Sequence, residues 1–186
     1  MFLERGNDNL TFDPQVDGYT SGVFFNTVAG TPAVTSNVLR LNTASVYTLA
    51  RFTVSMDMEF VLTVPTDPTS GDVRKWGLFL PSLGDRGACY FEIAGDKFYV
   101  RFFDNAGVEL LSQEVAWDSG AWTGNPIAYR IAKTDRGARF YVDGTQVAQQ
   151  TMPETTPLKT VNIPLAVGIK NNNADNLDLT SLTLLS

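Results

Sequence analysis

The clearest pattern of hydrophobic and polar positions runs from residue 52 to residue 64. The positions between the apolar ones are mostly polar and include Asp57 and Glu59. A period of two is that of a β-strand, whose successive side chains point to opposite faces. The segment therefore predicts a strand with one solvated face and one buried face, the buried face being formed by Phe52, Val54, Met56, Met58, Phe60, Leu62 and Val64.

Shorter apolar stretches, separated by turn-forming residues, fill most of the remaining chain. Asp143-Gly144 is typical of a type I′ hairpin turn, whose two central residues both need a positive φ. We find no helical period of useful length, no internal repeat and no interdomain linker. Many short strands with regular turns favour a sandwich or a barrel. We expect these strands over residues 76–80, 89–93, 97–103, 108–115, 127–131, 138–142, 145–151, 163–169 and 177–185.

The first 45 residues show the pattern less clearly. Residues 23–25 and 38–41 predict strands, and the small, polar stretch 27–37 between them predicts a loop. A chain of 186 residues suits one domain. We therefore expect a single domain over residues 1–186, with residues 1–45 as an N-terminal segment or arm that lies on this domain or on a neighbouring subunit.

Composition and charge exclude several classes of partner. The formal net charge is −6, and the lysines and arginines are scattered, so we expect no binding to nucleic acid. No window approaches the ~20 apolar residues of a membrane span, so we expect no membrane insertion. The start of the chain lacks the basic and apolar stretches of a signal peptide, which leaves three alternatives: the protein works where it is made, a leader was removed, or it leaves the cell by lysis.

The scarce residue types exclude several kinds of chemistry. Histidine is absent, which removes the serine–histidine and cysteine–histidine catalytic pairs and histidine-ligated zinc. Catalysis would have to depend on carboxylates, lysine, tyrosine or a hard metal ion. Cys89 is the only cysteine, so no intrachain disulfide can form. Its apolar neighbours predict a small buried hydrophobic side chain rather than a reactive thiol.

Three stretches together resemble the concanavalin A-like lectins and laminin G-like modules. They are residues 52–60, the segment from Trp122 through Asp143-Gly144 to residue 147, and the paired segments 164–169 and 177–184. The resemblance implies an all-β, two-sheet antiparallel sandwich of the jelly-roll type. It does not imply one activity, because such folds occur in lectins, hydrolases and structural proteins.

One pattern resembles the catalytic strand of the family 16 glycoside hydrolases, which carry Glu-x-Asp-x-Glu on this fold. Asp57 and Glu59 match the helper and the acid/base, but the nucleophile position is Ser55. A retaining mechanism needs two working carboxylates. We therefore interpret Asp57 and Glu59 as the solvated face of the strand and expect no enzymatic activity.

Two further groups of residues are candidate binding sites. Aromatic and cationic side chains that can contact sugars are Trp76, Tyr99, Arg101 and Arg130, whereas Trp122 is assigned to core packing. Asn173 and Asp175 lie in an oxygen-rich loop, and the resemblance implies calcium in such loops of relatives. Asparagines that satisfy their own backbone explain the same loop. We expect no other cofactor.

These observations lead to a non-catalytic, lectin-like recognition or structural module as the expected function. The setting that we expect is a bacteriophage virion, where the module decorates a capsid or serves as a tail adhesin and contacts glycans or neighbouring coat proteins. The expected location is the virion or an extracellular surface, and exposed strand edges would allow copies of the chain to pair. The alternatives are a stand-alone carbohydrate-binding lectin domain and a glycoside hydrolase.

Overall fold

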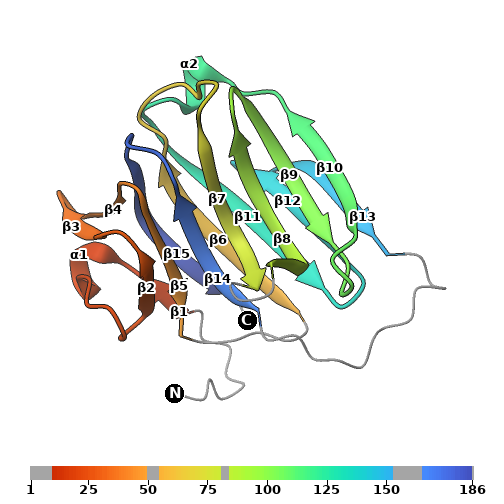
Figure 1. The fold of residues 1–186 in the computed structure, drawn as a ribbon, viewed down its shortest axis with the longest axis horizontal. Coiled ribbons are helices and arrows are strands. Elements are labelled where there is room, and N and C mark those ends of the chain that lie inside the picture. The colour runs from red at the N-terminus through yellow and green to blue at the C-terminus, as the bar shows by residue number, and fades with distance from the viewer. Residues whose placement is uncertain (1–9, 50–54, 81–83, 153–164, 186) are drawn as a thin grey trace.

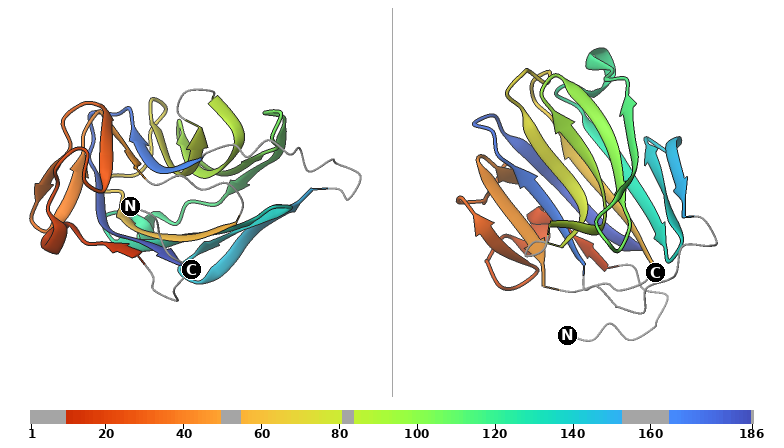
Figure 2. Two further views of the ribbon diagram at one scale, coloured as in Figure 1. Left: turned by 90° about the horizontal axis from the view of Figure 1, so that it is seen from below. Right: turned by 45° about the vertical axis from the view of Figure 1, so that its right-hand side comes forward.

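The computed structural model describes residues 10–49, 55–80, 84–152 and 165–185 (Figure 1). Its strands form two antiparallel sheets that stack face to face, as the end-on view of Figure 2 shows. This arrangement confirms the predicted jelly-roll β-sandwich. Among the described residues, no helix has the length and apolar character that a membrane crossing requires.

We name the two layers sheet A and sheet B. The strand order in sheet A is β13 (Thr145–Thr151), β12 (Gly137–Val142), β11 (Pro126–Thr134), β6 (Met56–Thr63), β15 (Leu177–Leu185), β4 (Val38–Leu41) and β3 (Ala33–Thr35), and β1 (Leu10–Phe12) also pairs with β15. The order in sheet B is β10 (Glu109–Val115), β9 (Lys97–Phe103), β8 (Gly84–Ala94), β7 (Val73–Leu80), β14 (Ala166–Asn171), β5 (Ala44–Thr48) and β2 (Phe25–Ala29). The one-turn helices α1 (Pro14–Asp17) and α2 (Ser119–Trp122) lie outside the sheets.

The strand with the clearest pattern, β6, lies in the middle of sheet A. Its alternate side chains Met58, Phe60 and Leu62 are fully buried, and Asp57 and Glu59 lie on the opposite face. The predicted faces of this strand are thus confirmed. Phe52 and Val54, which extend the pattern, lie outside the described residues.

The core between the sheets is centred on Trp76 of β7. Its indole stacks on the rings of Phe91 and Phe98, with centroids 6.0 and 5.9 Å away, and meets Tyr129 of sheet A edge-on at 4.9 Å. Trp122 of α2 packs on the rim of this core, 5.8 Å from Phe98. Aromatic packing of this kind joins the two sheets across the sandwich.

The hairpin between β12 and β13 turns at Asp143 and Gly144, whose φ angles of 46° and 75° confirm the predicted turn. At the opposite end of the strand order the prediction of a loop over residues 27–37 is wrong. β2 extends to Ala29, and β3 pairs with β4 inside that stretch. All three residues of β3 are exposed, so no buried apolar pattern marked it as a strand.

Residues 10–45 belong to the two sheets of their own chain. β1 and β4 both pair with β15, and β2 pairs with β5. The strands β1 to β4 thus all pair within this sandwich, with β4 in the interior of sheet A and β3 at its edge.

The two sheets also meet along one open side, where β10 and β13 are the outermost strands. The side-chain amide of Gln113 on β10 donates a hydrogen bond of 3.0 Å from Nε2 to the backbone carbonyl of Val147 on β13. This bond links the edges of the two sheets to each other.

Replacing Met58 or Phe60 with aspartate is expected to prevent folding. Both side chains are 0% exposed, and an unpaired buried charge costs several kcal/mol or more against a total stability of ~5–15 kcal/mol. The matched control is Val61→Asp, which places the same charge on the outer face of β6. Circular dichroism and thermal melting are the measurements, and a Phe60→Asp protein that melts like the wild type would contradict the assigned faces.

The thiol of Cys89 is expected to stay unreactive in the folded protein. Burial raises its pKa to about 12, so the thiolate is scarce at neutral pH, and the side chain is 0% exposed. A disulfide reagent such as Ellman's should label no thiol in the native protein and one thiol per chain in guanidinium. Rapid labelling of the native protein at pH 8 would show that this part of β8 opens readily.

Candidate functional site

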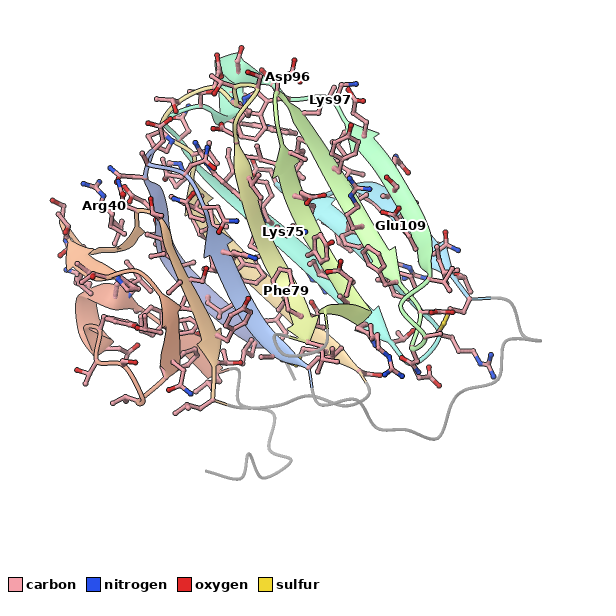
Figure 3. All side chains as sticks on the ribbon, viewed as in Figure 1. Arg40, Lys75, Phe79, Asp96, Lys97 and Glu109 are labelled. Carbon is pink, nitrogen blue, oxygen red and sulfur yellow. The ribbon has the colours of Figure 1, made fainter. Side chains whose placement is uncertain are left out.

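The outer face of sheet B, which points away from sheet A, carries the candidate site. On β7 the side chains of Trp76 and Leu78 point into the core, so those of Lys75 and Phe79 point outward; Figure 3 shows both in the middle of this face. Outward residues of a single-sided sheet are normally exposed and polar. Here several are apolar and buried, which sets this face apart.

An aromatic cluster occupies the centre of the face, and we define it as Tyr47, Phe79, Tyr90 and Phe103. Phe79 and Tyr90 stack with centroids 5.0 Å apart, Tyr90 and Phe103 stack at 5.8 Å, and Tyr47 meets Phe79 edge-on at 6.0 Å. Ala88 and Ala166 complete this second hydrophobic cluster. The four rings come from four strands, β5, β7, β8 and β9, and form a continuous apolar floor.

Gly168 lets the ring of Tyr47 lie directly on the sheet. Gly168 of β14 pairs with Gly77 on one side and with Tyr47 on the other. A Cβ atom on Gly168 would lie 2.3 Å from Cδ1 of Tyr47, so the tyrosine ring covers the glycine backbone. Any larger residue at position 168 would displace the ring.

Next to the aromatic cluster runs a charged row, defined as Lys75, Glu92, Arg101 and Glu109. The Glu92 carboxylate pairs with Lys75 Nζ at 3.0 Å and with Arg101 Nε at 2.8 Å. Arg101 Nη1 continues the row to Glu109 Oε1 at 2.6 Å and donates to Ser112 Oγ at 2.6 Å. The row crosses four adjacent strands, and it places one carboxylate between two cations.

The charged row is more accessible than the aromatic cluster. The side chains of Lys75 and Arg101 are each 21% exposed, and that of Glu92 is 10% exposed, whereas Tyr90 is 1% exposed. The Arg101 guanidinium also lies 4.6 Å above the centre of the Tyr99 ring. A ligand therefore meets the charged row and the Tyr99 ring first, with the aromatic cluster beneath.

The tyrosine hydroxyls of the cluster remain protonated. Burial, and then the nearby Asp85 carboxylate, raise the pKa of both Tyr47 and Tyr90 above the usual value. Lys75 Nζ donates to the Tyr90 hydroxyl at 3.2 Å. Asp85 and Glu92 both act on Tyr90, whose protonated hydroxyl accepts from Lys75 and can donate to a neighbouring acceptor.

The structure brings together two of the four predicted sugar-contacting residues. Tyr99 and Arg101 lie side by side on the outer face of sheet B. Trp76 is 0% exposed in the core, so its assignment to sugar contact is wrong. Arg130 lies on β11 of sheet A, on the opposite side of the sandwich, and cannot act with Arg101.

The predicted solvated face of β6 is an ion-paired face. Arg130 donates from Nε and Nη2 to the two carboxylate oxygens of Asp57 at 2.9 and 2.6 Å, and it lies opposite Glu59 in the register. Because both Asp57 oxygens accept from Arg130, this pair is a structural contact between β6 and β11.

The loop predicted to hold calcium lies beside a buried guanidinium, that of Arg74 on β7. Asn173 accepts from the backbone amide of Val73 at 2.7 Å and donates to Asp72. Arg74, 0% exposed, pairs with Asp72 at 3.3 Å and lies 3.7 Å from Asp175. In the described part of the chain no group of three acidic, cysteine or histidine side chains is arranged to hold a metal ion. Calcium binding at Asn173 and Asp175 stays a prediction, and a calcium ion would compete with Arg74 for these oxygens.

No family model matches the chain, and no curated protein matches it. Solved structures, in contrast, do match the chain. A Crh5 transglycosylase in complex with NAG superposes with a TM-score of 0.72 at 13% identity, covering 96% of this chain and 83% of the other. A Bacillus licheniformis β-glucanase gives 0.68 at 12% identity, covering 98% and 100%. An endo-β-1,3-glucanase from Pyrococcus furiosus gives 0.66 at 10% identity, covering 83% and 77%.

At these identities the likeness establishes the concanavalin A-like fold, as the sequence resemblance implied. The similar structures are mainly glucanases and transglycosylases, and this contradicts our expectations of a non-catalytic module and of a non-enzyme. Nothing in the comparisons supports a virion component. The sequence reasoning considered carboxylates on β6 alone, and the structure also places Asp85 and Glu92 on β8.

Sequence reasoning missed most of this site. Lys75, Glu92 and the aromatic cluster were not assigned a role, although one signal was present. In the segments 76–80 and 89–93, aromatic residues occupy both parities, since Phe79 and Tyr90 alternate out of phase with Trp76 and Phe91. A strand that is apolar on both faces must be covered on both or must bind something on one.

Substitution of Gly168 with alanine is expected to displace the Tyr47 ring and to destabilise the fold by ~1–3 kcal/mol through overpacking. The control is Gly71→Ala, where an added Cβ meets no heavy atom within 4 Å. Near-ultraviolet circular dichroism reports on the tyrosine, and urea denaturation reports on the free energy of unfolding. An unchanged tyrosine signal in Gly168→Ala would contradict the packing of Tyr47 on this glycine.

Proposed function

We propose that this protein is a carbohydrate-processing domain that binds a glycan chain on the outer face of sheet B and cleaves or transfers a glycosidic bond there. The observation that supports this most is the Glu92 carboxylate, held between Lys75 and Arg101 beside the aromatic cluster. The glucanases and transglycosylases among similar structures agree with it.

Glycan binding uses the accessible part of the site. Sugar rings pack on aromatic faces, and their hydroxyls need well-placed polar partners. Tyr99 and Phe103 provide the partly exposed rings, and Lys75, Arg101 and Ser112 provide donors along β7, β9 and β10. The chain of the glycan then follows the charged row across the strands.

The bond chemistry uses Asp85 and Glu92. Lys75 and Arg101 stabilise the negative charge of Glu92. This carboxylate is therefore suited to attack the anomeric carbon of the sugar, or to stabilise the positive charge that develops there. Asp85 forms none of the ion pairs found among the described residues, and we assign to it the role of the general acid that protonates the departing oxygen. A water molecule then completes hydrolysis, or a second sugar hydroxyl completes transfer.

Glu92→Gln is expected to abolish turnover by removing the charge that Lys75 and Arg101 hold in place. The assay measures new reducing ends and product length with β-1,3-glucan, mixed-linkage β-glucan and N-acetylglucosamine oligosaccharides. Controls are Glu114→Gln, an exposed carboxylate on the same sheet, and Glu59→Gln on sheet A. Both controls should retain activity.

The Glu92→Gln substitution removes an ionic partner from both Lys75 and Arg101 and can therefore destabilise the fold. For this reason the thermal melting temperature of each variant is measured together with its activity. Asp85→Asn, which breaks no ion pair among those described, provides an independent test and should also lose turnover. Activity retained in folded Glu92→Gln, or the absence of turnover by the wild type on every glycan, would refute the proposal.

A further inference from the structure

A cavity lies on sheet A, on the opposite side of the molecule from the charged row. It has a volume of about 210 Å³ and is formed where β11 ends, β12 begins and β13 ends. Its lining includes Ala132, Arg136, Gly137, Arg139 and Gln149. Nothing in the proposed glycan chemistry uses this cavity.

Small residues create the space. Ala132, Arg139 and Gln149 are neighbours across three strands, and Thr134, Gly137 and Thr151 form the next row. A Cβ on Gly137 would lie 2.3 Å from the backbone oxygen of Gln150, so the strands approach closely at this point. The floor of the cavity is therefore formed by backbone and by the methyl group of Ala132, and longer side chains form its walls.

Two arginines of the wall have no carboxylate partner. Within the described residues, the side chains of Arg136 and Arg139 take part in no ion pair or hydrogen bond, and Nη1 of Arg136 is buried without a partner. The carboxylate opposite Ala132 in the register, Asp57, already binds Arg130. A buried guanidinium nitrogen without an acceptor costs free energy, so it needs a partner that the described part of the chain does not provide.

The remaining polar groups of the lining have no negative charge. Gln149, Gln150, Thr134 and Thr151 can donate or accept hydrogen bonds, and among the described residues no aspartate or glutamate lines the cavity. Two unpaired cations in a chain of net charge −6 make this a local positive site on an acidic protein. A cation or an apolar group would not satisfy Arg136.

We propose that this cavity binds an oxyanion group, a carboxylate or a sulfate, carried by a small molecule or by a charged sugar. The planar guanidinium groups of Arg136 and Arg139 match the two-oxygen geometry of such groups. The amides and hydroxyls of the wall bind the remaining oxygens. The inference rests on the lining of sheet A alone and does not depend on the function proposed for sheet B.

The test uses the full chain, labelled with ¹⁵N, and follows backbone amides near Gly137 by NMR. The probes are sodium sulfate, sodium glucuronate and glucose, each at an ionic strength held constant with sodium chloride. Sulfate and glucuronate should give saturable shifts around Ala132, Gly137 and Gln149, and glucose should give none. Saturation by glucuronate but not sulfate would assign the site to carboxylates, and the reverse would assign it to sulfates.

Arg136→Gln and Arg139→Gln should each weaken oxyanion binding about tenfold or more, because each removes a charge-assisted contact. The matched control is Arg86→Gln, which removes the same charge from β8 of sheet B and should change binding less than about twofold. The proposal fails if neither oxyanion gives saturable shifts in the wild type, or if Arg86→Gln weakens binding as much as the two cavity variants. Glu92→Gln should bind the oxyanion normally, which separates this test from that of the glycan site.

Discussion

The central strands of sheet B bury side chains on both of their faces, and the rest of the structure depends on this. The inward residues of β7, led by Trp76, join the two sheets through aromatic contacts with Phe91, Phe98 and Tyr129. The outward residues of the same strands, Phe79 and Tyr90, build a second apolar layer on the far side. A sheet that needs cover on both faces is typical of a sandwich whose outer surface has a task beyond contact with water.

The charged row follows from that second layer. Charges beside an apolar surface are partly removed from water, where an unpaired charge is costly and a paired one is held firmly. Glu92 accordingly has two cationic partners, and Arg101 has two acidic ones. The same constraint acts at Arg74, whose Nη2 pairs with Asp72 and Asp175, whereas Arg136 forms no ion pair among the described residues. The ion pairs of Glu92, Arg101 and Arg74 stabilise the sandwich, whereas the partly buried Arg136 has no such partner among the described residues.

Sequence patterns predicted the fold well because strand faces depend on local alternation. Met58, Phe60 and Leu62 identified the buried side of β6, and Asp143-Gly144 identified a hairpin, since both signals act over a few residues. The site was predicted poorly because it is assembled from four strands that are distant in sequence. Tyr99 and Arg101 lie side by side because they are two residues apart on one strand, and their contact with sugars stays a prediction. Lys75 and Glu92 come together only through the register of β7 with β8, which no local pattern reveals.

The contact between Gln113 and Val147 has a consequence for how the protein behaves at high concentration. An open sheet edge offers unpaired backbone groups to which the strand of another molecule can add, and this is a common start of aggregation. Here the side-chain amide uses a carbonyl on the edge strand β13, and the neighbouring edge strand β10 carries the charged side chains Glu109 and Glu114. The two edges on this side of the sandwich are thus protected against the growth of a continuous sheet between molecules.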